Sequence, residues 1–89
     1  MDKSEFLSLI DKASTLLYQN YEEDGLKTYI EIVKLIQQAD NNGLSVYLTE
    51  DTVYHIKESS TAYYNTDILG LADEIVMIGA TLNGWWNKY

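Results

Sequence analysis

The chain of 89 residues contains no cysteine, no proline and no arginine. Without cysteine, neither disulfides nor thiolate metal sites are available, so packing alone must hold the fold together. The absence of proline suits long helices with few rigid turns. The absence of arginine removes the side chain that most often clamps phosphate or carboxylate groups with two hydrogen bonds.

Basic residues are scarce: six lysines stand against 14 acidic residues, which gives a net charge of −8. Such a chain is repelled by phosphate backbones and by anionic membranes, so we expect no direct nucleic-acid or membrane partner. Its apolar runs are too short to span a bilayer, and the N-terminal stretch MDKSEFLSLI is acidic and amphipathic, unlike a signal peptide. We therefore expect a cytoplasmic protein. The usage of Asn, Lys, Ile and Tyr indicates an AT-rich genome, such as that of a Firmicute or its phage.

The first half of the chain has apolar residues at helical spacing in two segments. The first segment carries Phe6, Leu9, Ile10, Ala13, Leu16 and Leu17, and the second carries Leu26, Tyr29, Ile30, Val33 and Ile36. A tight turn near Asn20 separates them, and Asn20 followed by Glu23 resembles a capping box that opens the second helix. Because the connection is short, the spacing predicts an antiparallel hairpin over about 4–39.

The second half begins with a stretch of turn-forming residues. We expect a loop over 40–50 that places Leu44 and Leu48 on the core, followed by a second hairpin over about 51–86. The inner side of its first helix is predicted to carry Val53, Ile56 and Tyr63. Its last helix has a wide apolar arc of Ile68, Leu71, Ala72, Ile75, Ile78 and Leu82, with Leu69, Val76 and Ala80 on a neighbouring face. A helix so widely apolar is either central in its fold or covered by a partner.

These segments predict an all-α protein: one domain over 1–89, built as a four-helix bundle from two hairpins joined by a loop. A weak internal sequence repeat supports the prediction of two hairpins. At an offset of 45 residues, Asn20 matches Asn65, Gly25 matches Gly70 and Ile30 matches Ile75. Duplication and chance remain equally open explanations of this repeat.

The segment AYYNTDILGLADEI resembles a pattern in short, largely uncharacterised all-helical proteins of Firmicutes. The matching positions are Ala62, Asp67, Leu71, Ala72 and Asp73. The first hairpin is also similar in style to flagellar export chaperones and tetratricopeptide hairpins. The resemblance implies a helical fold, and the latter two families imply recognition of other proteins.

The sequence contains no complete catalytic or metal-binding pattern. His55 and Glu58 are one helical turn apart and could present two ligands, but a catalytic zinc needs three and a di-iron bundle needs more. We interpret His55 as a partly exposed helix histidine. The acidic run from Glu22 to Asp24 suits a helix N-terminus, and the neighbours Asp73 and Glu74 point in different directions around a helix. We therefore predict no enzyme, no metal and no cofactor.

Aromatic residues are abundant, with eight tyrosines and a C-terminal WWNKY. Tyrosine and tryptophan are favoured in interfaces, although a tyrosine at the edge of a core is the more ordinary role. Trp85, Trp86, Tyr89 and Tyr64 are the candidate partner-binding residues. Trp86 is expected to cap the core, or, if Gly84 ends the helix, both rings could fold back as a lid.

Two functions remain open on this evidence. The first is a small interaction module, an adaptor or chaperone-like protein, that binds another protein or forms a homodimer through its last helix. The second is an acidic immunity or phage anti-defence inhibitor that blocks a basic nucleic-acid-binding site on an enzyme. The stretch SEFLSLI is similar to the first helix of colicin immunity proteins. An acidic face shared by both hairpins would favour the second function.

Overall fold

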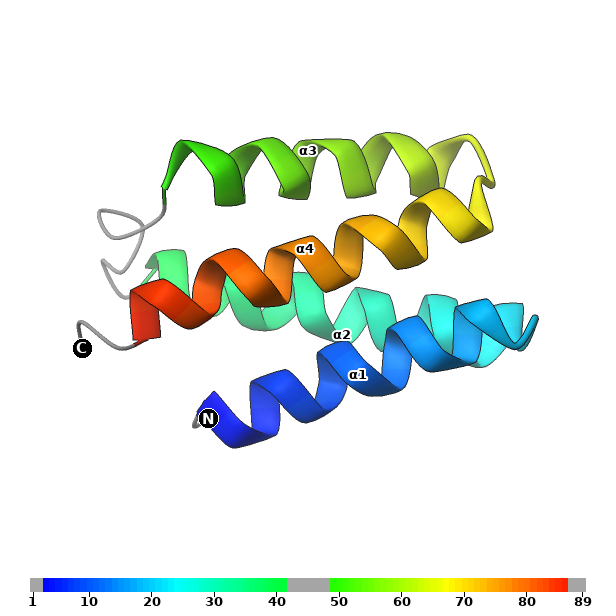
Figure 1. Cartoon of the computed structure of the whole chain (residues 1–89), viewed down its shortest axis with the longest axis horizontal. Coiled ribbons are helices and arrows are strands. Elements are labelled where there is room, and N and C mark those ends of the chain that lie inside the picture. The colour runs from blue at the N-terminus through cyan, green and yellow to red at the C-terminus, as the bar shows by residue number, and fades with distance from the viewer. Residues whose placement is uncertain (1–2, 42–48, 87–89) are drawn as a thin grey trace.

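The computed structural model describes residues 3–41 and 49–86. They form four α-helices: α1 (Lys3–Tyr18), α2 (Glu22–Asn41), α3 (Glu50–Tyr64) and α4 (Ile68–Trp86). The predicted all-α bundle of two hairpins is confirmed (Figure 1). The loop prediction for Leu44 and Leu48 lies outside the described residues.

The helices pack in the spatial order α2, α1, α4, α3, because α1 contacts both α2 and α4, and α4 contacts α3. In Figure 1, α4 runs between α3 and α1, while α2 lies behind them. The approach of α1 to α4 is close at Gly79: a Cβ atom there would lie 2.8 Å from Cγ2 of Ile10. Gly79 therefore allows α1 and α4 to pack closely, because the side chain of Ile10 comes too near for a Cβ atom at this position.

The core combines apolar residues from all four helices. It contains Phe6, Ile10, Ala13 and Leu17 from α1, Tyr29 and Ile32 from α2, Ala62 from α3, and Leu71, Ala72, Ile75, Ile78 and Leu82 from α4. The predicted inner residues of α4, and those of α1 except Leu16, lie in this core or pack against it. Leu16 is only partly buried. In α2, Ile32 is fully buried although it was not among the predicted inner residues. Ile30 and Val33, which were predicted to face the core, are only partly buried against it.

The prediction for the inner side of α3 is wrong in part. Its buried residues are Thr52, Ser59 and Ala62, whereas Val53 is 36% exposed. Ile56 and Tyr63 are partly buried against the core. Small side chains at these positions allow α3 to approach its neighbours, and the two hydroxyl groups find hydrogen-bond partners. The apolar period of α3 alone could not reveal this arrangement, because its inward stripe is mostly polar.

Both hairpin turns close with the same pair of backbone hydrogen bonds. In the first turn, Tyr21 N–H donates to Leu16 O and Asn20 N–H donates to Leu17 O; in the second, Asp67 N–H donates to Ala62 O and Thr66 N–H donates to Tyr63 O. These are Schellman motifs, in which one residue adopts a left-handed conformation. The left-handed residues are Asn20, with φ 65°, and Thr66, with φ 56°.

The prediction that Asn20 caps α2 is therefore wrong, since Asn20 instead ends α1. The structural repeat also has an offset of 46 residues, from Asn20 to Thr66, and the same offset relates Gly25 to Leu71 in the first helical bonds that follow. The sequence repeat at 45 is thus one residue out of register with the repeated turn.

Side chains cap the two helices of the second hairpin. Thr49 Oγ1 accepts a hydrogen bond of 3.1 Å from the backbone N–H of Thr52. An oxygen of Asp67 accepts one of 3.1 Å from the backbone N–H of Gly70. Each bond satisfies a donor that the first turn of a helix leaves without a partner. No helix in the described part of the chain has both the length and the apolar character needed to cross a membrane.

Candidate functional site

His55 joins α3 to α4 and does not pair with Glu58. Its Nδ1 lies 2.6 Å from Oε2 of Glu74, and both side chains are partly buried. The ring of Tyr54 packs edge-on against the imidazole, with centroids 5.1 Å apart. Among the described residues, no three His, Asp or Glu side chains are placed to hold a metal ion together. The histidine therefore acts in the structure as a link between helices.

Asp73, next to Glu74, reaches the opposite neighbour. Its Oδ1 accepts a hydrogen bond from the hydroxyl of Tyr18 on α1. This hydrogen bond raises the pKa of Tyr18, with smaller contributions from burial and from the negative charge of Asp73. The two consecutive carboxylates thus diverge, as the helical spacing predicts, and each holds a different helix.

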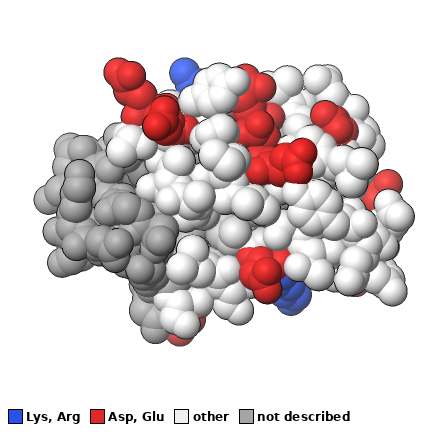
Figure 2. Space-filling view, in the orientation of Figure 1, with Lys and Arg blue, Asp and Glu red and all other residues white. Residues whose placement is uncertain are grey.

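Between these two links, the outer face of α4 is apolar and open to solvent. Leu69 is 59% exposed, Val76 42% and Met77 41%, and Ala80 is also exposed. These residues follow helical spacing, so they lie along one side of α4, and we call this side the α4 outer face. The exposed Asp73, four residues after Leu69 and four before Met77, lies on the same side. Figure 2 shows a mostly uncharged band in the middle of this view, with acidic groups along its edges.

Acidic residues lie on both sides of the α4 outer face. On α1, Asp11 shares a helix side with Tyr18, which is bonded to Asp73. On α3, Asp51 and Glu58 share a side with His55, which is bonded to Glu74; Asp11, Asp51 and Glu58 are all exposed. Figure 2 shows acidic groups on both sides of the uncharged band.

Tyr64, a predicted partner-binding residue, does not belong to this face. It is 80% exposed, and its ring packs edge-on against that of Tyr63. The ring of Tyr63 in turn contacts Tyr29 of α2, so this tyrosine cluster lies on the α2 side of α3. The hydroxyl of Tyr29 shares a buried hydrogen bond of 2.9 Å with Ser59, and burial is the main cause that raises the pKa of Tyr29.

The remaining predicted contacts are at the C-terminus. Trp85 and Trp86 belong to the last turn of α4, so the helix continues past Gly84 and the alternative in which Gly84 ends it is wrong. The side chains of Trp85 and Trp86, and all of Tyr89, lie outside the described part of the structure. Their role in partner binding stays a prediction.

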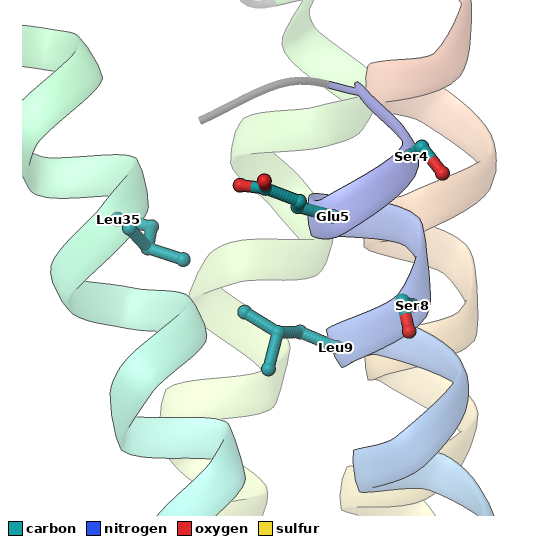
Figure 3. A pocket seen from close by; sticks show the side chains of 5 residues that line it. All are labelled: Ser4, Glu5, Ser8, Leu9 and Leu35. Carbon is teal, nitrogen blue, oxygen red and sulfur yellow. The ribbon is translucent and has the colours of Figure 1, made fainter.

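A shallow hollow separates the first turns of α1 from α2. It is lined by Ser4, Glu5, Ser8, Leu9 and Leu35. Figure 3 shows Leu9 and Leu35 pointing into it from opposite helices, while Ser4 and Ser8 point away from α2. His55 lies on α3 and is engaged with Glu74, so neither serine has it as a base. The hollow offers apolar contact and no recognisable chemistry.

Part of the α4 outer face was predictable from the sequence, because Leu69, Val76 and Ala80 follow helical spacing on a face next to the predicted core side. The two hydrogen bonds that join α4 to its neighbours were not predictable, since Tyr18 and Asp73 are 55 residues apart and His55 and Glu74 are 19 apart. Neither pair has a local sequence signal. No family model, curated protein or solved structure matches the chain.

Proposed function

We propose that this protein is a small interaction module without catalytic activity, which binds another protein through the α4 outer face. The observation that carries the proposal is the exposure of Leu69, Val76 and Met77 along one side of the most apolar helix. The opposite side of α4 is already committed to the core, so these residues are not needed there. Exposed apolar side chains that share one side of a helix and are accompanied by polar groups are typical of protein interaction sites.

The links on both sides of this face support a binding role. Tyr18 with Asp73 and His55 with Glu74 fix α4 against its two neighbours, so its exposed side chains are presented on a well-supported helix. A preorganised surface loses less conformational entropy when a partner binds. Methionine adds adaptability, because its flexible side chain fits irregular apolar surfaces.

Affinity capture from the native host tests the proposal. The bait is compared with a Leu69→Ser, Val76→Ser double variant and with Val53→Ser, whose site on α3 is similarly exposed but lies away from α4. We expect one protein to be retained by the wild type and by Val53→Ser, and lost by the double variant. Equal retention by all three would rule out the α4 outer face as the binding site.

An acidic inhibitor of a nucleic-acid enzyme is the second candidate. It is favoured by the way Asp11, Asp51 and Glu58 from different hairpins flank one face. It ranks second because most residues of that face are apolar, whereas a basic nucleic-acid site would meet its best match in continuous acidic charge. The inhibitor would become the first candidate if the protein bound a basic nuclease with an affinity that falls steeply with added salt. That affinity should also be unchanged in the Leu69→Ser and Val76→Ser variants.

A further inference from the structure

The α4 outer face has a shape and a charge pattern that together define what can cover it. We infer that its occupant is a basic amphipathic helix of a different protein, lying along α4 with its apolar side on Leu69, Val76 and Met77. This inference rests on the proposed function and names the chemical class of its partner.

The shape favours a helix. The apolar residues extend from Leu69 to Ala80, a distance of roughly 16 Å along the helix axis at 1.5 Å per residue. The surface is a narrow line along one helix, with α1 on one side and α3 on the other. An amphipathic helix presents a matching line of anchors at every third or fourth residue, and helix pairs pack in this way.

The charge favours a basic occupant. Asp73 lies within the line, where its carboxylate accepts a hydrogen bond from Tyr18 of α1. The line is bordered by Asp11 on the α1 side and by Asp51, Glu58 and Glu74 on the α3 side. Lysines are drawn only outside the uncharged band in Figure 2. Lysine or arginine residues bordering the apolar stripe of a bound helix would face these carboxylates on both sides, and such pairing steers and orients association.

The same charge disfavours a second copy of this chain. Each copy has a net charge of −8, so a dimer through α4 would bring two acidic rims together. Like charges that face each other across an interface cost several kcal/mol. The complementary surface must therefore come from a partner of opposite charge.

A designed peptide tests the inference directly. The probe is a fluorescein-labelled helix of about 18 residues, five turns, with leucine along one side and lysine on both flanks. One control peptide has the same composition in scrambled order, and another replaces every lysine by glutamate. By fluorescence anisotropy, we expect the probe to bind at least about tenfold more tightly than either control, since tenfold corresponds to the 1.4 kcal/mol expected of a modest specific contact.

Matched variants locate the binding site. Val76→Ser should weaken binding of the probe about fivefold or more, as loss of a central interface side chain does, whereas Val53→Ser should leave it unchanged. An Asp51→Asn, Glu58→Gln double variant should weaken binding and reduce its salt dependence. The equal charge change in Glu22→Gln, Glu31→Gln, at exposed sites on α2, should have a smaller effect. Circular dichroism confirms that each variant is folded.

Three outcomes would overturn the inference. The scrambled peptide could bind as tightly as the probe, which would show that charge attraction alone explains the binding. Val76→Ser and Val53→Ser could have the same effect, which would place the site elsewhere. Sedimentation could show a stable dimer that Leu69→Ser, Val76→Ser dissociates, which would make a second copy the occupant.

The host capture separates this inference from the proposed function. If the captured partner depends on Leu69 and Val76 but contacts them with a segment that is not basic, the interaction module stands and the basic helix does not. If no captured protein depends on these residues and the probe does not bind, both are wrong.

Discussion

In the first hairpin both helices bury large apolar side chains, whereas in the second hairpin α4 does so almost alone. The contribution of α3 to the core is Ala62 together with two buried hydroxyl residues, Thr52 and Ser59. Side-chain hydrogen bonds complement this packing: His55 reaches Glu74 of α4, and Ser59 meets Tyr29 of α2. The comparison indicates that α3 is positioned by small residues and specific polar contacts, while α1 and α4 supply most of the hydrophobic stabilisation.

The largest expected effect comes from α4. Ile75 is fully buried, so Ile75→Ala should lower the free energy of unfolding by about 2–5 kcal/mol. The neighbouring Val76→Ala, at an exposed site, should change it by about 0.5 kcal/mol or less. Urea denaturation of both variants measures the difference. Similar losses in both would show that α4 does not anchor the second hairpin.

The polar attachment of α3 should have a smaller effect. Ser59→Ala leaves the buried hydroxyl of Tyr29 without this partner and should cost about 1–3 kcal/mol. The double variant Tyr29→Phe, Ser59→Ala should cost less than the sum of the single changes, because it removes both halves of the hydrogen bond. A thermodynamic cycle from urea melts measures this coupling. Additive losses would mean that the bond contributes nothing to holding α3.

The two turns predict a gain in stability at one site. Thr66 is a β-branched residue at φ 56°, where an L-residue carries a conformational cost. Thr66→Gly should therefore stabilise the protein by about 1 kcal/mol, while Asn20→Gly should change stability by only about a few tenths, since Asn tolerates this conformation. Thermal melts compare the two variants. A loss of stability in Thr66→Gly would contradict the equivalence of the turns.

Surface charge on α2 should matter little. Glu22 is exposed in the first turn of α2, where its charge interacts favourably with the helix dipole. Glu22→Ala should cost within about 1 kcal/mol, the scale of a single helix-terminal charge. Urea melts at low and high salt provide the measurement, and the small loss should shrink further in high salt. A loss as large as that of Ile75→Ala would reverse the assignment of the core.

The smallest expected effect is a decline of stability in alkali. Tyr18 and Tyr29 have pKa values above the ordinary 10.0, owing respectively to the bond with Asp73 and to burial. The folded state holds these hydroxyl protons more tightly than the unfolded state does. The contribution of the two tyrosines to the free energy of unfolding is therefore complete below pH 10, and it is lost as the pH rises through their pKa values in the folded state. Replacing both by Phe should flatten the decline. Tyr21→Phe, at an exposed site, is the control, and it should leave the slope unchanged.

The sequence was sufficient to predict the architecture because α1 and α4 bury apolar residues at regular helical spacing, from Phe6 to Leu17 and from Leu71 to Leu82. It was insufficient for α3, where Val53 suggested an inner side that Thr52 and Ser59 in fact occupy. Hydrophobic periodicity cannot identify a helix side that is buried through small and polar residues.

For the candidate site, the second apolar side of α4 was visible in Leu69 and Val76. Its surroundings were not, because the acidic residues that border it come from separate helices. Asp11 and Glu58 become neighbours of the same face only through the packing of α1 and α3 on α4. The spread of acidic residues along the chain therefore concealed their convergence in space.

The divergence of Asp73 and Glu74 has a mechanical consequence. A rotation of α4 about its long axis would remove its buried residues from the core and bring its exposed residues toward it. Rolling in either direction would draw one carboxylate away from Tyr18 or the other away from His55. Two adjacent residues thus oppose rotation of α4 in both directions, and they reinforce the orientation that its buried apolar side already favours.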